Sequence, residues 1–142
     1  MSVFLDPRKL EDVGLVTYDD SGAMRPRSGL TPWDNLRVEV TNECFGLSRF
    51  QPLTEGRQRM WQKCTELMEQ YLQAAKKQLG EAAPNPVLQQ EKQDTLLGIH
   101  KLLDPNEAFA SVAASCLMNS PYEWAKALAT QPYQHLPVTR PN

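Results

Sequence analysis

Few side chains of the kinds that act as nucleophiles, general bases or soft-metal ligands are present in this sequence. It has three cysteines, Cys44, Cys64 and Cys116, and two histidines, His100 and His135. A nucleophilic cysteine needs a depressed pKa and a neighbouring base, and Cys44 with His100 is the one pairing worth naming. No CxxC or HExxH spacing supplies the ligands of a zinc site. We therefore expect structural thiols, no metal site and no bound cofactor.

Acidic residues occur side by side rather than at spacings that converge on a substrate or a cation. Asp19 and Asp20 precede a serine and a glycine, a composition typical of a turn. Asp34 and Glu39 have the spacing of acids in a nuclease core, but position 41, where that pattern needs lysine, is threonine. The glycines never form GxGxxG or GxxxxGK. The sequence therefore predicts neither a catalytic carboxylate pair nor a phosphate-binding loop.

A concentration of basic residues lies around the start of the longest expected helix. Two of them would occupy its first turns, where the helix dipole disfavours cations, and contacts to nucleic-acid phosphates would offset that cost. A solvated face with ion pairs to Glu39 or Glu43 accounts for the same residues. The candidate nucleic-acid-binding residues are Arg25, Arg27, Arg49, Arg57, Arg59 and Lys63.

Composition excludes several classes of protein. The 142 residues are 41% hydrophobic and 23% charged, as in a globular domain, and a net charge of -2 gives no overall attraction for nucleic acid or an anionic membrane. No apolar run approaches the roughly 20 residues that a membrane-spanning helix needs. The first residues lack the basic region and apolar run of a secretory signal, and the cysteines are odd in number and widely spaced. We expect one soluble, cytoplasmic domain that makes no membrane contact.

Proline positions mark where helices should begin. Five prolines follow a residue whose side-chain oxygen can accept from the free amides of a first helical turn, and proline in that turn loses no useful donor. The five pairs are Asp6-Pro7, Thr31-Pro32, Asn85-Pro86, Asp104-Pro105 and Ser120-Pro121. Four of them precede apolar residues at helical spacing. We interpret all five as helix starts.

The longest helix is expected without such a start, after Thr54, over residues 55–79, with Gly80 as its stop. Shorter helices are expected over 86–103, 105–118 and 121–130. In each, apolar residues recur every three or four positions, which predicts one buried face. These faces comprise Trp61, Cys64, Met68, Tyr71 and Ala75, then Leu96, Ile99 and Leu103, then Phe109, Val112, Ala113, Cys116 and Leu117, and finally Tyr122, Trp124, Ala125 and Leu128.

The first 53 residues are expected to be irregular but part of the same domain. Residues 7–13 suit a short helix, residues 15–18 an extended segment, and residues 24–29 an exposed loop.

Residues 32–45 fit two patterns. Trp33, Leu36, Val40 and Cys44 form a helical stripe, whereas the residues from Leu36 to Val40 alternate like a strand. We favour the helix, because the Thr31-Pro32 pair precedes it.

Two segments look costly to order without a partner. Residues 89–94 are polar on every side of their helix, and residues 131–142 form an extended tail in which prolines stand beside apolar anchors. The candidate partner-binding residues in these segments are Gln90, Gln93, Tyr133, Leu136 and Pro137.

These elements predict an all-α fold: a compact helical bundle over residues 54–130, an irregular N-terminal third, and the tail. By elimination, the leading functional hypothesis is a non-catalytic module that binds a protein partner or a second copy of the chain. The alternative is a small nucleic-acid-associated subunit that uses the basic residues. An enzyme with an unrecognised site is the third hypothesis.

Overall fold

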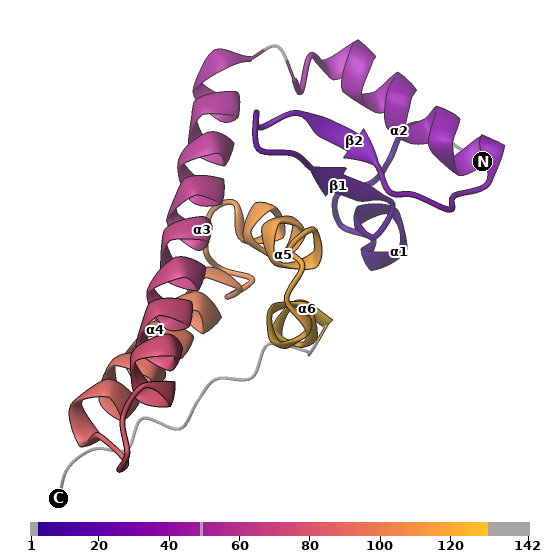
Figure 1. The fold of residues 1–142 in the computed structure, drawn as a ribbon. Coiled ribbons are helices and arrows are strands. Elements are labelled where there is room, and N and C mark those ends of the chain that lie inside the picture. Colours follow the sequence, from indigo (N-terminus) through magenta and orange to yellow (C-terminus); the bar gives the residue numbers. More distant parts are fainter. Residues whose placement is uncertain (1–2, 49, 131–142) are drawn as a thin grey trace, which may run out of the picture.

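The computed structural model describes residues 3–48 and 50–130 of the chain, and this part contains six helices and one two-stranded sheet (Figure 1). The longest helix, α3 (Gln51–Leu79), forms an antiparallel hairpin with α4 (Pro86–Leu102). The short helix α5 (Ala110–Met118) packs on α3, and α6 (Glu123–Thr130) packs on α5. The predicted helical fold class is confirmed. The predicted tail, residues 131–142, lies outside the described residues.

A small hairpin connects the N-terminal third to the long helices. After α1 (Leu10–Val13), strand β1 (Val16–Tyr18) pairs antiparallel with β2 (Met24–Pro26), so that Tyr18 lies opposite Met24. β1 packs against α5, and β2 packs against α2 (Pro32–Phe45). The expected extended segment is therefore β1. The exposed loop expected over residues 24–29 is wrong for its first half, because the turn before it folds Met24 back onto β1 and buries it.

Two of the five proline-marked starts are helix caps. Thr31 Oγ1 accepts from the Asp34 amide at 3.2 Å, and α2 begins at the next residue, Pro32. Asn85 Oδ1 accepts from the Val87 amide at 3.0 Å at the start of α4. In both cases the side chain satisfies an amide that the helix leaves unpaired. The prediction of a helix rather than a strand over residues 32–45 is confirmed.

The other three proline-marked starts are wrong. Asp6 and Asp104 accept from the amides two residues further on, at 2.9 Å each, and form turns that α1 and α5 follow only later. Ser120 Oγ instead donates to the carbonyl of Leu117 at 2.7 Å, behind it at the end of α5. An oxygen-bearing residue before proline closes a turn as readily as it caps a helix, so the pair alone does not distinguish the two.

The longest helix starts four residues earlier than expected. α3 begins at Gln51 with Pro52 in its first turn, and Thr54 lies inside the helix, where its hydroxyl donates to the carbonyl of Phe50 at 3.2 Å. Threonine adopts this bond within helices as well as at their starts, which explains why Thr54 was mistaken for a cap. The stop at Gly80 is confirmed, because α3 ends at Leu79.

One buried cluster joins the four C-terminal helices. The predicted buried faces of α5 and α6 are confirmed, with Leu117 and Ala125 fully buried. On α3 and α4 the predicted Cys64, Met68 and Ile99 are buried, whereas toward the helix ends the preceding residue is the more deeply buried one: Ala74 rather than Ala75, and Leu102 rather than Leu103. The core members are Met60, Cys64, Met68, Ile99, Leu102, Val112, Ala113, Cys116, Leu117 and Ala125.

We expect Gly56→Ala to destabilise the fold by about 1–3 kcal/mol, because it overpacks the contact between α3 and the start of α5. A Cβ at Gly56 would lie 2.5 Å from Cζ of Phe109. That ring has little room to withdraw, because Phe109 packs against the core cluster. Urea unfolding measures the loss.

Gly98→Ala is the matched control. A Cβ there meets Leu67 at ordinary contact distances of 3.6 and 3.7 Å, so replacing glycine inside α4 should stabilise the protein by roughly 0.5–1 kcal/mol. Equal effects of the two substitutions would contradict the close approach at Gly56.

Candidate functional site

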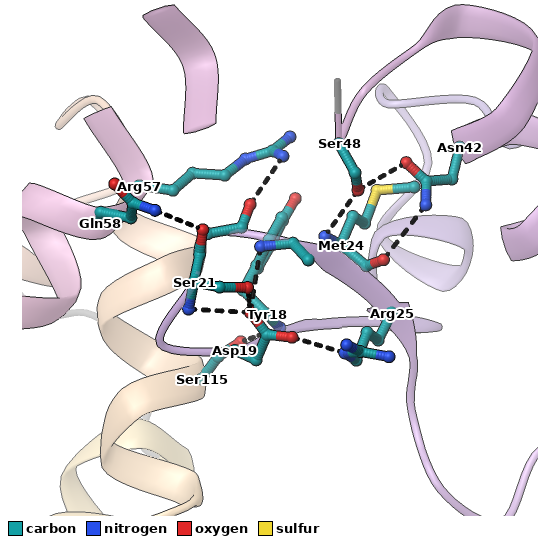
Figure 2. Close-up of polar contacts among 12 residues, drawn as sticks. Tyr18, Asp19, Ser21, Met24, Arg25, Asn42, Ser48, Arg57, Gln58 and Ser115 are labelled. Atoms are coloured by element: carbon teal, nitrogen blue, oxygen red, sulfur yellow. Dashed lines mark hydrogen bonds and ion pairs between the residues drawn. The ribbon is translucent and has the colours of Figure 1, made fainter. Parts of the chain in front are cut away.

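Arg57, a predicted phosphate-binding residue, is buried at the junction of the hairpin with α3. It is only 5% exposed. Its Nη1 donates to the carbonyl of Gly22 at 3.1 Å (Figure 2) and to that of Leu47 at 2.6 Å, and its guanidinium lies 4.8 Å from the centre of the Tyr18 ring. The side chain thus joins the hairpin turn, the segment after α2 and the first turns of α3. The charge is satisfied by carbonyl oxygens and an aromatic face.

The surroundings of Arg57 form a continuous polar network (Figure 2). Gln58 Nε2 donates to the carbonyl of Ser21 at 2.8 Å, beside the Gly22 carbonyl that Arg57 holds. The Met24 amide donates to Ser48 Oγ at 3.1 Å, and Ser48 Oγ donates to Asn42 Oδ1 at 2.8 Å. The turn itself approaches α3 so closely that a Cβ at Gly22 would lie 2.6 Å from the carbonyl oxygen of Thr54. This network fixes the hairpin against α3 and α2.

The structure separates the predicted basic residues. Arg59 and Lys63 lie four residues apart on the exposed face of α3, away from the buried Arg57. Arg25 is exposed on β2 and pairs with Asp19, and Arg27 is exposed after that strand. Arg49 lies outside the described residues. Of the five basic residues that the structure describes, Arg57 is thus buried and the other four are exposed.

We expect Arg57→Lys to lower the stability by about 1–3 kcal/mol, because one ammonium group cannot reproduce the shared hydrogen bonds and the stacking of a planar guanidinium. Arg59→Lys, two positions along and exposed, should change the free energy of unfolding by less than about 0.5 kcal/mol. Chemical denaturation of both variants measures the difference. If Arg57→Lys unfolds with the same free energy as the native protein, the junction does not depend on the planar guanidinium.

The cysteines fall into two environments. Cys64 and Cys116 are buried where α3 meets α5, and each thiol donates at 3.8 Å to a carbonyl of the other helix, those of Ala113 and Trp61. The neighbouring thiol of Cys116, together with burial, raises the pKa of Cys64. A raised thiol pKa opposes nucleophilic chemistry at Cys64, and burial shields both thiols from solvent, which fits the structural role expected for them.

Cys44 does not share that role, because it lies exposed on α2. His100, its expected partner, lines a small hollow with residues of α5 and α6, and Cys44 is not among the residues around that hollow. His135 lies outside the described residues. The structure thus gives the Cys44 and His100 pairing no support.

We expect one thiol to react rapidly with an aromatic disulfide reagent in the native protein and all three to react after unfolding. Burial excludes the reagent from Cys64 and Cys116, whereas Cys44 is open to it. Release of the coloured thiolate counts the groups, and Cys44→Ser should abolish the fast phase. A second fast thiol in that variant would show that the contact between α3 and α5 opens readily.

The sequence pattern did not indicate which side of α2 faces the protein. Val38 is fully buried, whereas Trp33 and Leu36 are 42% and 45% exposed. Polar anchors determine the inner side: Arg37 Nη2 donates to Asp12 Oδ2 at 3.0 Å, and Asn42 Nδ2 donates to the carbonyl of Met24 at 3.3 Å. The predicted stripe therefore faces outward. We call Trp33, Leu36, Val40 and Cys44 the outer face of α2.

The predicted partner-binding residues on α4 lie at its surface. Gln90 and Gln93 are exposed, and Gln90 Nε2 donates to Asp94 Oδ1 at 2.8 Å along the helix. Tyr133, Leu136 and Pro137 fall outside the described residues.

Within residues 3–48 and 50–130, no group of three or more histidine, cysteine or acidic side chains is placed to hold a metal ion. In the same part of the chain, no helix is long and apolar enough to cross a membrane. Comparison of the chain with protein-family models, curated protein sequences and solved structures found no match.

Proposed function

We propose that this chain is a non-catalytic interaction or assembly module that docks a protein partner, or a second copy of itself, on the outer face of α2. The observation that carries the proposal is the exposure of Trp33 and Leu36 at helical spacing, with Val40 and Cys44 continuing the same face. Scattered apolar residues are normal on protein surfaces, but an aligned set that includes tryptophan is typical of interfaces.

The inner side of α2 supports this proposal, because it already holds the helix in place. Val38 and Thr41 are buried, and Asn42 bonds to β2. The fold does not need Trp33 and Leu36 to position α2. A contact with a partner would explain why these exposed positions carry large apolar side chains.

More exposed apolar side chains continue from the C-terminal end of α2. Phe4 and Phe45 contact each other edge to face, with ring centres 5.3 Å apart, and both are exposed, as is Phe50 at the start of α3. Aromatic side chains offer large contact areas at low entropic cost. The rings therefore add exposed apolar surface beside the end of α2.

We expect Leu36→Glu to weaken self-association or partner binding by about tenfold or more while leaving the melting temperature nearly unchanged, because it places a charge on an apolar contact outside the core. Light-scattering mass over a range of protein concentrations and quantitative pull-down from the source cells measure these effects. Leu97→Glu, at a 38% exposed leucine on α4, is the matched control.

Equal behaviour of the two variants would reject the outer face of α2 as the binding surface. A nuclease-treated pull-down separates the alternative, in which exposed Arg59 and Lys63 contact nucleic-acid phosphates. If the co-purifying proteins are lost after nuclease treatment and at moderate salt, that alternative is favoured, since neutralisation of phosphates is strongly salt-dependent.

A further inference from the structure

A cavity of about 390 Å³ opens where the N-terminal segment, the hairpin, the end of α2 and the start of α5 meet. Its volume falls within the roughly 300–1,000 Å³ of sites that hold small organic ligands. The wall is largely apolar, and its main members are Leu5, Val13, Val16, Met24, Phe45 and Leu47. Neither the outer face of α2 nor the core between the long helices contributes to it.

Thr41 and Asp12, two of the polar residues in the wall, are engaged within the protein. Thr41 Oγ1 accepts from the Leu5 amide at 3.0 Å. Asp12 Oδ2 accepts from the Asp6 amide at 2.8 Å and from Arg37 at 3.0 Å. The amide of Asp6, aided by Arg37 and against the effect of burial, holds the pKa of Asp12 below its ordinary value. Asp12 is thus an ionised carboxylate whose charge is already balanced.

The second acid in the wall is balanced as well. Asp6 forms an ion pair with Arg8 at 3.1 Å, and the residues that line the cavity include no lysine or arginine. An anionic ligand would meet two carboxylates and no cation, and a cationic ligand would compete with existing partners for both acids. Burial of an unpaired charge is strongly unfavourable. The chemistry of the wall therefore selects for a neutral ligand.

The mouth of the cavity is also apolar. Val13, 41% exposed, and Phe45 lie both in the wall and at the surface. Largely apolar hollows take up apolar molecules, because an ordered water inside would find few hydrogen-bond partners. A ligand entering here would also cover the exposed parts of both side chains.

We propose that this cavity is a binding site for a small, neutral, apolar molecule of about the size of two aromatic rings. The site is independent of the proposed function, because it needs no partner on α2. It also differs from the small hollow around His100, which lies toward α6.

The test uses two fluorescent probes with the same aromatic skeleton. Phenylnaphthylamine is neutral, and anilinonaphthalene sulfonate adds one negative charge. Titration of the whole protein should give saturable one-to-one binding of the neutral probe, with the sulfonate about tenfold weaker or more, because the wall holds two carboxylates and no free cation. Equal affinity of the two probes, or no saturable binding of the neutral one, would overturn the proposal.

Three variants locate the bound probe. Val13→Phe and Phe45→Trp enlarge side chains in the cavity wall, from exposed positions that should not disturb folding. Each should weaken the neutral probe severalfold or more by occupying its volume. Val87→Phe, the same kind of change at a 66% exposed residue at the start of α4, should leave binding unchanged.

Circular dichroism and thermal melting confirm that each variant is folded. If the probe binds the two enlarged variants as tightly as it binds the native protein, the cavity is not its site. Loss of binding in Val87→Phe alone would place the probe at the helical hairpin and likewise overturn the proposal. None of these outcomes depends on partner binding, so the proposed function stands or fails separately.

Discussion

A guanidinium held by backbone carbonyls connects the two parts of this molecule. Arg57 lies in the first turns of α3, and the carbonyls it binds belong to Gly22 in the hairpin turn and Leu47 after α2. A buried cation that lost these partners would carry a large desolvation cost, so the hairpin and the segment after α2 must stay beside α3. The sheet of three-residue strands is too small to be stable alone. Its position depends on this bond, on the Tyr18 ring beneath it, and on the contact with α5.

Two glycines allow this arrangement, because the chain approaches itself closely on both sides of the same helical turn. Gly22 brings the hairpin turn against the carbonyl of Thr54, and Gly56 accepts the ring of Phe109. Any larger side chain at either place would separate α3 from its neighbour. The start of α3 is thus packed on one side by the N-terminal third and on another by the entry to α5. The core and the cavity wall are therefore coupled through a short stretch of one helix.

Sequence patterns predicted what is decided locally and failed where distant segments decide. The caps at Thr31 and Asn85 act within three residues, so they could be recognised. The similar pairs at Asp104 and Ser120 do not cap helices, because the path of the chain after the proline selects between a turn and a helix. Arg57 carries no local sign of burial, since its partners are 35 and 10 residues away. Because Arg59 and Lys63 follow it on the same helix, the sequence predicts Arg57 at the surface.

The orientation of α2 has a physical cause that bears on function. The helix carries two sets of residues that could pack inward, and the larger and more apolar one, with Trp33 and Leu36, faces outward. The fold selects the other side because Arg37, Thr41 and Asn42 find partners there in Asp12, Leu5 and Met24. With those polar groups turned outward, the Asp12 carboxylate and the two backbone groups would lose their bonds. Hydrogen bonding thus outweighs apolar area in orienting α2, and the apolar area left over is what a partner can cover.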